Sequence, residues 1–110
     1  MLSKKERSKI AKQNRAKGYR VERNDVLYHR QRGVFAFRIP TKQQRGDLAT
    51  WDVIVCFPDQ ADEVHQCKSR LGLMTKIEKE NHIRTVRYYG LIPVHCYNEK
   101  YKGLKFEVLS

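Results

Sequence analysis

Residues 51–70 read Trp51-Asp-Val-Ile-Val-Cys-Phe-Pro-Asp-Gln-Ala-Asp-Glu-Val-His-Gln-Cys-Lys-Ser-Arg70, a pattern typical of a β-hairpin. A run of β-branched residues, 53–55, predicts the first strand. A segment rich in turn-forming residues, 58–62, follows it and indicates a reversal near its middle. The second strand is then expected over residues 63–69. We expect the rest of the chain to be built around this hairpin.

Antiparallel pairing about this turn predicts which side chains share a face. It places Asp52 opposite Gln66 or Lys68, and all three then lie on one face because side chains alternate along a strand. The other face is expected to carry Val53, Val55, His65 and Cys67. A face that holds a carboxylate, an amide and an ammonium group at Cβ separations of about 5 Å is unusual for a purely structural sheet. A solvated sheet face explains the same residues equally well, so the hairpin alone leaves both interpretations open.

The length of 110 residues fits one compact domain, 1–110, in which residues 1–16 form a basic N-terminal extension or helix. This N-terminus is basic, but no apolar segment follows it, which does not fit a signal peptide. Nowhere is an apolar run long enough to span a membrane. The sequence therefore predicts a soluble protein of the cytoplasm.

The cysteines and histidines are scattered along the chain. They are Cys56, Cys67, Cys96, His29, His65, His82 and His95. No two cysteines form a close pair, so we expect small buried thiols in a reducing compartment rather than a disulfide framework or a zinc ribbon. The histidines lack metal-ligand spacing and are expected on the surface or in packing roles.

The positive charge is concentrated in the first part of the chain. Residues 1–45 hold fourteen Lys or Arg and three acids, whereas residues 46–110 hold nine of each, so the whole net charge of +11 precedes the hairpin. No long amphipathic apolar face accompanies this charge, which favours nucleic acid over an anionic membrane as the partner. A basic tail that serves only solubility is the alternative interpretation.

The remaining elements are predicted from capping, periodicity and turn residues. Ser3 with Glu6 has the spacing of a capping box and predicts a helix start. A second helix, or the continuation of the first, is expected from Lys17 to about Arg32, and a strand over Val34–Ile39 with Phe35, Phe37 and Ile39 on one face. A polar, basic loop over 41–50 follows. A helix over Thr75–Tyr89 is predicted by a capping box at Thr75 and Glu78 and by an apolar face of Ile77, Ile83, Val86 and Tyr89, and two strands are expected over Ile92–Tyr97 and Leu104–Leu109. The order αβββαββ predicts an α/β fold with a mixed sheet flanked by helices.

Four side chains form the predicted site: Glu22, Asp52, Gln66 and Lys68. Glu22 has no basic residue three or four positions away on its helix, which favours a role in a site over a local ion pair. The carboxylates and the amide oxygen are hard ligands suited to Mg²⁺, and Lys68 is placed to orient a water or to stabilise a transition state. Asp47 in the basic loop is a rival to Asp52, which we prefer because the start of a strand holds a side chain rigidly.

The pattern resembles the PD-(D/E)xK nuclease superfamily, and within it the archaeal-type Holliday junction resolvases with their viral and phage relatives. The resemblance runs from about Lys17 to Ser110. It is carried by Lys17-Gly18, Glu22-Arg23, Gly33, Arg38, Asp52-Val-Ile-Val and Gln66-Cys-Lys-Ser-Arg70. Gln66 departs from the family because an acid is usual there, although a Gln-x-Lys version occurs in the endonuclease subunit of a heteromeric bacterial transposase. Trp51 departs from the Pro in the superfamily's name.

The resemblance implies a restriction-endonuclease-like fold and a Mg²⁺-dependent endonuclease, with Mn²⁺ able to substitute, that resolves four-way DNA junctions by paired nicks as a homodimer. It implies that Glu22, Asp52 and Gln66 bind the metal and that Lys68 assists hydrolysis. The basic residues expected to contact DNA are Lys17, Arg20, Arg23, Arg38, Lys42, Arg45 and Arg70. Two alternatives remain open: nicking of ordinary duplex by a restriction- or transposase-type enzyme, and a non-catalytic basic nucleic-acid-binding module.

Overall fold

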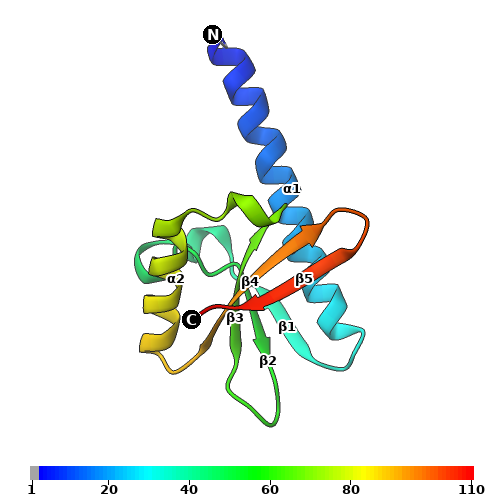
Figure 1. Ribbon diagram of the computed structural model, residues 1–110, viewed down its shortest axis with the longest axis vertical. Helices are drawn as coiled ribbons and strands as arrows, with labels where there is room; N and C mark the ends of the chain where they lie inside the picture. Colours follow the sequence, from blue (N-terminus) through cyan, green and yellow to red (C-terminus); the bar gives the residue numbers. More distant parts are fainter. Residues whose placement is uncertain (1–2) are drawn as a thin grey trace.

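The computed structural model describes residues 3–110 and has the element order αβββαββ (Figure 1). The helices and strands are α1 (Lys4–Arg30), β1 (Phe35–Arg38), β2 (Val53–Cys56), β3 (Glu63–Lys68), α2 (Lys76–Tyr88), β4 (Ile92–Glu99) and β5 (Gly103–Val108). Three short 3-10 segments lie between them: η1 (Thr41–Gln43), η2 (Gly46–Leu48) and η3 (Leu71–Leu73). The predicted order and the α/β class are confirmed.

The five strands form one mixed sheet in the order β1-β2-β3-β4-β5. Strands β3 and β4 are parallel and are joined through α2, whereas the other neighbours are antiparallel. The predicted hairpin is β2–β3, with Val53 opposite His65 and Val55 opposite Glu63. This register centres the turn on Asp59. The backbone N–H of Asp52 donates to the carbonyl of His65 at 3.0 Å, which continues the pairing to the residue before β2.

Helix α1 is one continuous element of 27 residues rather than two helices. Ser3 caps its start, because its hydroxyl accepts a hydrogen bond from the Glu6 N–H, as the sequence predicts. Gly18 does not interrupt the helix, since one glycine costs only about 1 kcal/mol in a helix interior. The C-terminal half of α1 packs on the sheet, and the N-terminal half projects away from it (Figure 1). Gly33, with φ +76°, turns the chain into β1.

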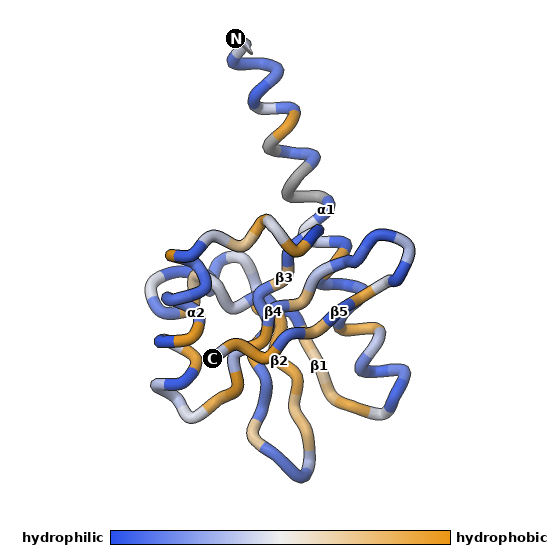
Figure 2. The backbone as a smooth tube through the Cα atoms, viewed as in Figure 1, coloured by the Kyte–Doolittle hydropathy of each residue, from blue (hydrophilic) through white to orange (hydrophobic). Residues whose placement is uncertain are grey.

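Apolar side chains lie on both faces of the sheet. The strands contain both hydrophobic and hydrophilic residues, and β3 is largely hydrophilic (Figure 2). Alternation along the strands produces two clusters. The cluster facing α1 contains Val21, Val26, Ala36, Val53, Val55, Cys67 and Cys96. The second cluster, on the side of α2, contains Trp51, Val64 and Val86. The sheet is therefore the middle layer between the two helices.

Phe35, Phe37 and Ile39 share one face of β1 as predicted, but this face is opposite to the one that packs on α1. In β1 the residue that faces the core is Ala36, which is fully buried, whereas Phe35 is 61% exposed. A small residue fits there because α1 packs closely against this strand. The predicted apolar face of α2 is partly wrong: Val86 is buried and Ile83 is half-buried, whereas Ile77 and Tyr89 are exposed. The other buried positions are His82 and Thr85.

The buried face of α2 is polar because its side chains complete hydrogen bonds to neighbouring elements. The hydroxyl of Thr85 accepts a hydrogen bond from the Trp51 indole N–H at 3.2 Å. His82 Nε2 lies 2.8 Å from the carbonyl of Val64, and its Nδ1 lies 2.8 Å from the Thr50 hydroxyl. A periodicity search for apolar residues misses such positions. No helix in the described range 3–110 is long and apolar enough to cross a membrane.

A buried ion network joins α1 to β3. His65 Nδ1 lies 2.6 Å from Asp25 Oδ2, and His65 Nε2 lies 2.8 Å from Glu63 Oε1. Because both partners are carboxylates, both ring nitrogens donate and the imidazole is protonated. Burial alone would lower the pKa of His65, but its hydrogen bonds to Asp25 and Glu63 raise the pKa well above 6.5. Burial likewise opposes ionisation of Asp25, but the hydrogen bonds from His29 and His65 lower its pKa below 3.8.

We expect Asp25→Ala to lower the free energy of unfolding by about 3–5 kcal/mol, because it removes one of the two carboxylates that pair with the buried His65 imidazolium. Since the pKa of Asp25 is lowered from 3.8 and that of His65 is raised from 6.5, the network stabilises fully between those values. Its contribution falls as the pH drops through the pKa of folded Asp25 or rises through that of folded His65. Urea unfolding at several pH values measures the effect.

The exposed Asp47 provides the control, because Asp47→Ala should change stability by less than about 0.5 kcal/mol. Equal stability losses in Asp25→Ala and Asp47→Ala would contradict the role of the network.

Candidate active site

One cleft of about 400 Å³ contains all four predicted site residues. It lies where the start of β2 and the end of β3 meet α1 and the first turn of α2. Its lining residues are Gly18, Tyr19, Glu22, Ala49, Asp52, Gln66, Cys67, Lys68, Ser69, Leu73 and Glu78. The fold thus brings together two carboxylates, an amide and an ammonium group that are up to 46 positions apart in sequence, from Glu22 to Lys68.

Asp52 is held by hydrogen bonds to both carboxylate oxygens. The backbone N–H of Cys67 donates to Oδ2 at 2.7 Å, and the Gln44 side-chain amide donates to Oδ1 at 2.7 Å. Burial raises the pKa of Asp52 to about 6, although these hydrogen bonds oppose the rise. Gln44 was not predicted from the sequence, where it is one of several polar residues in the loop before β2. The side chain of Asp52 is therefore fixed in orientation before any ligand binds.

Glu22 lies on α1 with 6% of its surface exposed. Its partner comes from another element: Arg38 Nε lies 3.6 Å from Glu22 Oε1. Burial and the charge of Asp52 raise the pKa of Glu22 to about 7, and Arg38 opposes this rise only in part. Neighbouring carboxylates with raised pKa values are typical of functional sites.

Gln66 and Lys68 share an acidic partner that the sequence reasoning did not identify as part of the site. The Gln66 amide Nε2 donates to Glu78 Oε2 at 3.0 Å, and Lys68 Nζ donates to the same oxygen at 2.7 Å. The other amide oxygen, Gln66 Oε1, is buried and has no hydrogen-bond partner. The sequence contained one signal for Glu78, its position as the acid of the capping box that starts α2, and this box is present.

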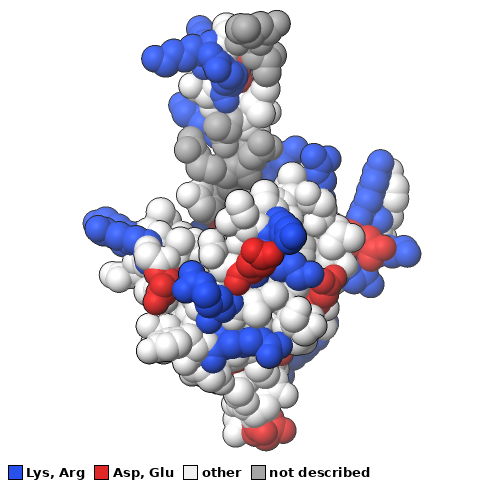
Figure 3. Space-filling view, turned by 60° about the vertical axis from the view of Figure 1, so that its left-hand side comes forward, with Lys and Arg blue, Asp and Glu red and all other residues white. Residues whose placement is uncertain are grey.

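Several predicted DNA contacts lie around the cleft. Lys17 and Arg70 line an adjoining hollow that also includes Ser69 and Leu73, two residues of the cleft wall. The other predicted contacts are Arg20, Arg23, Arg38, Lys42 and Arg45, all of them exposed. Lys and Arg are spread over the face in Figure 3 and along the projecting helix, with a few acidic side chains between them. Asp47, the rival to Asp52, is exposed and lies outside the cleft lining.

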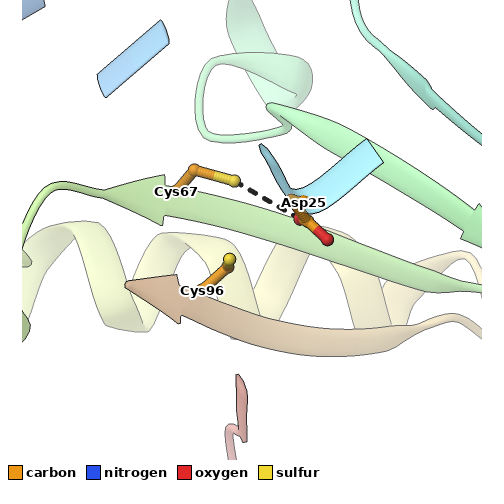
Figure 4. Close-up of side chains that lie close together, drawn as sticks. All are labelled: Asp25, Cys67 and Cys96. Atoms are coloured by element: carbon orange, nitrogen blue, oxygen red, sulfur yellow. Dashed lines mark hydrogen bonds between the residues drawn. The ribbon is translucent and has the colours of Figure 1, made fainter. Parts of the chain in front are cut away.

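A second group of potential ligands is buried between α1 and the sheet. Asp25, Cys67 and Cys96 place one ligand atom each within 4.8 Å of one another (Figure 4). The Asp25 carboxylate already accepts hydrogen bonds from His65 and from the Cys67 thiol, at 3.5 Å to the sulfur. All three cysteines are free thiols; Cys67 and Cys96 are buried as predicted, whereas Cys56 is only half-buried. This group therefore serves the buried network, and the cleft is the candidate site for a hard cation.

We expect Glu22→Gln to stabilise the metal-free protein at pH 8 by up to about 3 kcal/mol, because the pKa of Glu22 is raised from 4.5 to about 7. A carboxyl with a raised pKa loses stability as the pH rises through 4.5 to 7, since the folded state must release a proton that it binds tightly. Near pH 4 both side chains are neutral and the gain disappears. Thermal unfolding in chelator across this pH range measures it, with the exposed Glu80→Gln as the control. A gain that is equal at pH 4 and pH 8 would contradict the assignment.

Comparison with known proteins bears on the fold. No family model and no curated protein matches the sequence. Among solved structures, the chain is similar to Archaeoglobus fulgidus Hjc, described as a Holliday junction resolvase from an archaeal hyperthermophile. The two are 16% identical, with a TM-score of 0.62, and the match covers 84% of this chain and 72% of that chain. The chain therefore has an Hjc-like, restriction-endonuclease-like α/β fold, as the resemblance predicted.

Proposed function

We propose that this protein is a divalent-cation-dependent, structure-selective DNA endonuclease that resolves four-way junctions by paired symmetric nicks as a homodimer, in recombination and repair. The observation that carries the proposal is the single cleft in which Glu22, Asp52, Gln66 and Lys68 meet. The Hjc-like fold supports it, because the solved structure that this chain resembles, Archaeoglobus fulgidus Hjc, is that of a Holliday junction resolvase. The excess of basic residues on the N-terminal part supports DNA as the substrate.

The residues of the cleft fit a hard divalent cation such as Mg²⁺ or Mn²⁺. Glu22 and Asp52 offer carboxylate oxygens whose ionisation is opposed by burial, and Gln66 offers a buried oxygen without a partner. When bound, such a cation neutralises the scissile phosphate and lowers the pKa of an attacking water.

The side chains of the protein have separate roles in orienting the site, stabilising charge and binding phosphates. Asp52 is oriented by the Cys67 N–H and by Gln44, so its free lone pairs have a fixed direction. The positive charge of Lys68 stabilises the negative charge that develops on the phosphate or its leaving oxygen. Lys17 and Arg70, beside the cleft, hold the flanking phosphates. In this arrangement binding and hydrolysis depend on different residues.

Asp52→Asn and Lys68→Ala should each reduce cleavage of a labelled four-way junction by about 100-fold or more, while junction binding stays within a few-fold of wild type. The reason is that each residue acts on the reacting phosphate, whereas the surrounding basic residues bind the rest of the DNA. Gel assays of cleavage with Mg²⁺, and of binding without it, measure the two effects separately. Asp47→Asn is the matched control and should keep both activities.

A linear duplex of the same sequence tests the structure selectivity. Preferred cleavage of the junction in competition supports a resolvase, whereas equal cleavage favours a duplex-nicking enzyme. Equal loss of binding and cleavage in both variants would contradict a catalytic role. Wild-type protein that binds DNA but is inert with Mg²⁺ and Mn²⁺ would indicate a binding module.

Junction affinity should fall steeply with salt concentration, because basic side chains release counterions from phosphates. Each of Lys17→Ala and Arg70→Ala is expected to reduce the slope of log K against log salt by about 1. Arg32→Ala is the control, because Arg32 follows the C-terminal end of α1, away from the cleft, and binds the carbonyl of Tyr28. Fluorescence anisotropy at several salt concentrations gives the slopes. A flat dependence in the wild type would contradict the electrostatic part of the proposal.

A further inference from the structure

Glu78 contributes a third carboxylate to the cleft. It lies in the first turn of α2 and lines the same cavity as Glu22 and Asp52. Its side chain is only 31% exposed, and both of its oxygens accept hydrogen bonds. Such a degree of fixation is unusual for a glutamate near a helix start, where a single capping contact to the N-cap backbone is enough.

The Gln66 amide is oriented by this carboxylate. A carboxylate can only accept hydrogen bonds, so the NH₂ group of Gln66 must face Glu78 Oε2, 3.0 Å away. Its carbonyl oxygen, Oε1, then points away from Glu78, and it is buried without a partner although Gln66 is only 4% exposed. A buried acceptor without a partner costs about 1–3 kcal/mol, and a ligand in the cleft removes that cost.

Lys68 is bound to the same oxygen of Glu78. Gln66 and Lys68 are two positions apart on β3, so both side chains lie on the face that α2 approaches. Lys68 Nζ lies 2.7 Å from Glu78 Oε2, while the Thr75 backbone N–H donates to Oε1 at 3.1 Å. These contacts pair the Glu78 carboxylate with the Lys68 ammonium group and fix both of its oxygens.

We infer that Glu78 is a positioning residue that holds the Gln66 amide with its oxygen free for a divalent cation and supplies the negative charge that this amide lacks. The contacts through Oε2 serve this purpose, since the helix cap uses only Oε1. In this arrangement an amide on β3 and a carboxylate on α2 together do what one acid on the strand would do. The inference rests on the proposed function only in taking the cleft as a cation site.

The test is the affinity of the full-length protein for Mn²⁺ without DNA, measured by calorimetry and by the electron paramagnetic resonance signal of free Mn²⁺. Glu78→Gln should weaken Mn²⁺ binding by about 10-fold to 100-fold, as for other residues that orient metal ligands. Glutamine retains the capping contact to Thr75, so the helix start is kept. The matched control is Glu80→Gln, which removes one exposed charge from the same helix and should leave the affinity unchanged.

A rescue variant separates positioning from folding. Gln66→Glu combined with Glu78→Gln exchanges the amide and the carboxylate and keeps both the hydrogen bond between them and the net charge. This double variant should return to nearly the wild-type Kd for Mn²⁺. Thermal unfolding in chelator should give similar midpoints for the wild type, Glu78→Gln and Glu80→Gln, which a purely structural role of Glu78 does not predict.

Four outcomes would overturn the inference: wild-type protein that does not bind Mn²⁺, Glu78→Gln with wild-type affinity, a loss equal to that of Glu80→Gln, or a double variant no better than Glu78→Gln. The proposed function fails separately. If Mn²⁺ binding depends on Glu78 but no DNA is cleaved, the cation site stands and the nuclease does not. If junctions are cleaved and Glu78→Gln has no effect on cleavage or Mn²⁺ affinity, only the inference fails.

Discussion

The ion pair between Asp25 and His65 connects the long helix to the centre of the sheet. Both side chains are fully buried, and the pair joins α1 to β3 at 2.6 Å. Glu22 lies three positions before Asp25, on the same side of the helix. Fixing Asp25 therefore fixes the rotation of α1 and places Glu22 over the cleft. The arrangement of the candidate site depends on this internal contact, which itself does not face the cleft.

The cleft is destabilising for the protein that contains it. The raised pKa values of Glu22 and Asp52 mean that folding makes ionisation of both carboxyl groups less favourable, because both are buried and the charge of Asp52 lies near Glu22. Gln66 adds a buried oxygen without a partner. These costs are offset elsewhere, by the apolar clusters on both faces of the sheet and by the buried network. In the function that we propose, a divalent cation bound in the cleft would offset these costs.

The sequence predicts the hairpin register and the capping box because both depend on local patterns. The turn after Phe57 sets the register of β2 and β3, and Thr75 with Glu78 sets the start of α2. The contacts of Asp25 and Gln44, and those of Glu78 with β3, depend on how distant elements pack, which no spacing rule contains. Phe35 is mostly exposed because α1 packs on the opposite face of β1, against Ala36, and this too is a contact between distant elements.

The projecting half of α1 has a further consequence for its helix–coil equilibrium. Its like-charged pairs Lys5–Lys9 and Lys9–Lys12 are exposed and are spaced as neighbours on a helix, which costs a few tenths of a kcal/mol each. A solvated helix of this length is marginal without packing. Its helicity is therefore coupled to ionic strength and to nearby anions. Neutralising these lysines would stabilise the helical state of the projecting half of α1. The length of helix that extends from the sheet therefore depends on the salt and the anions around it.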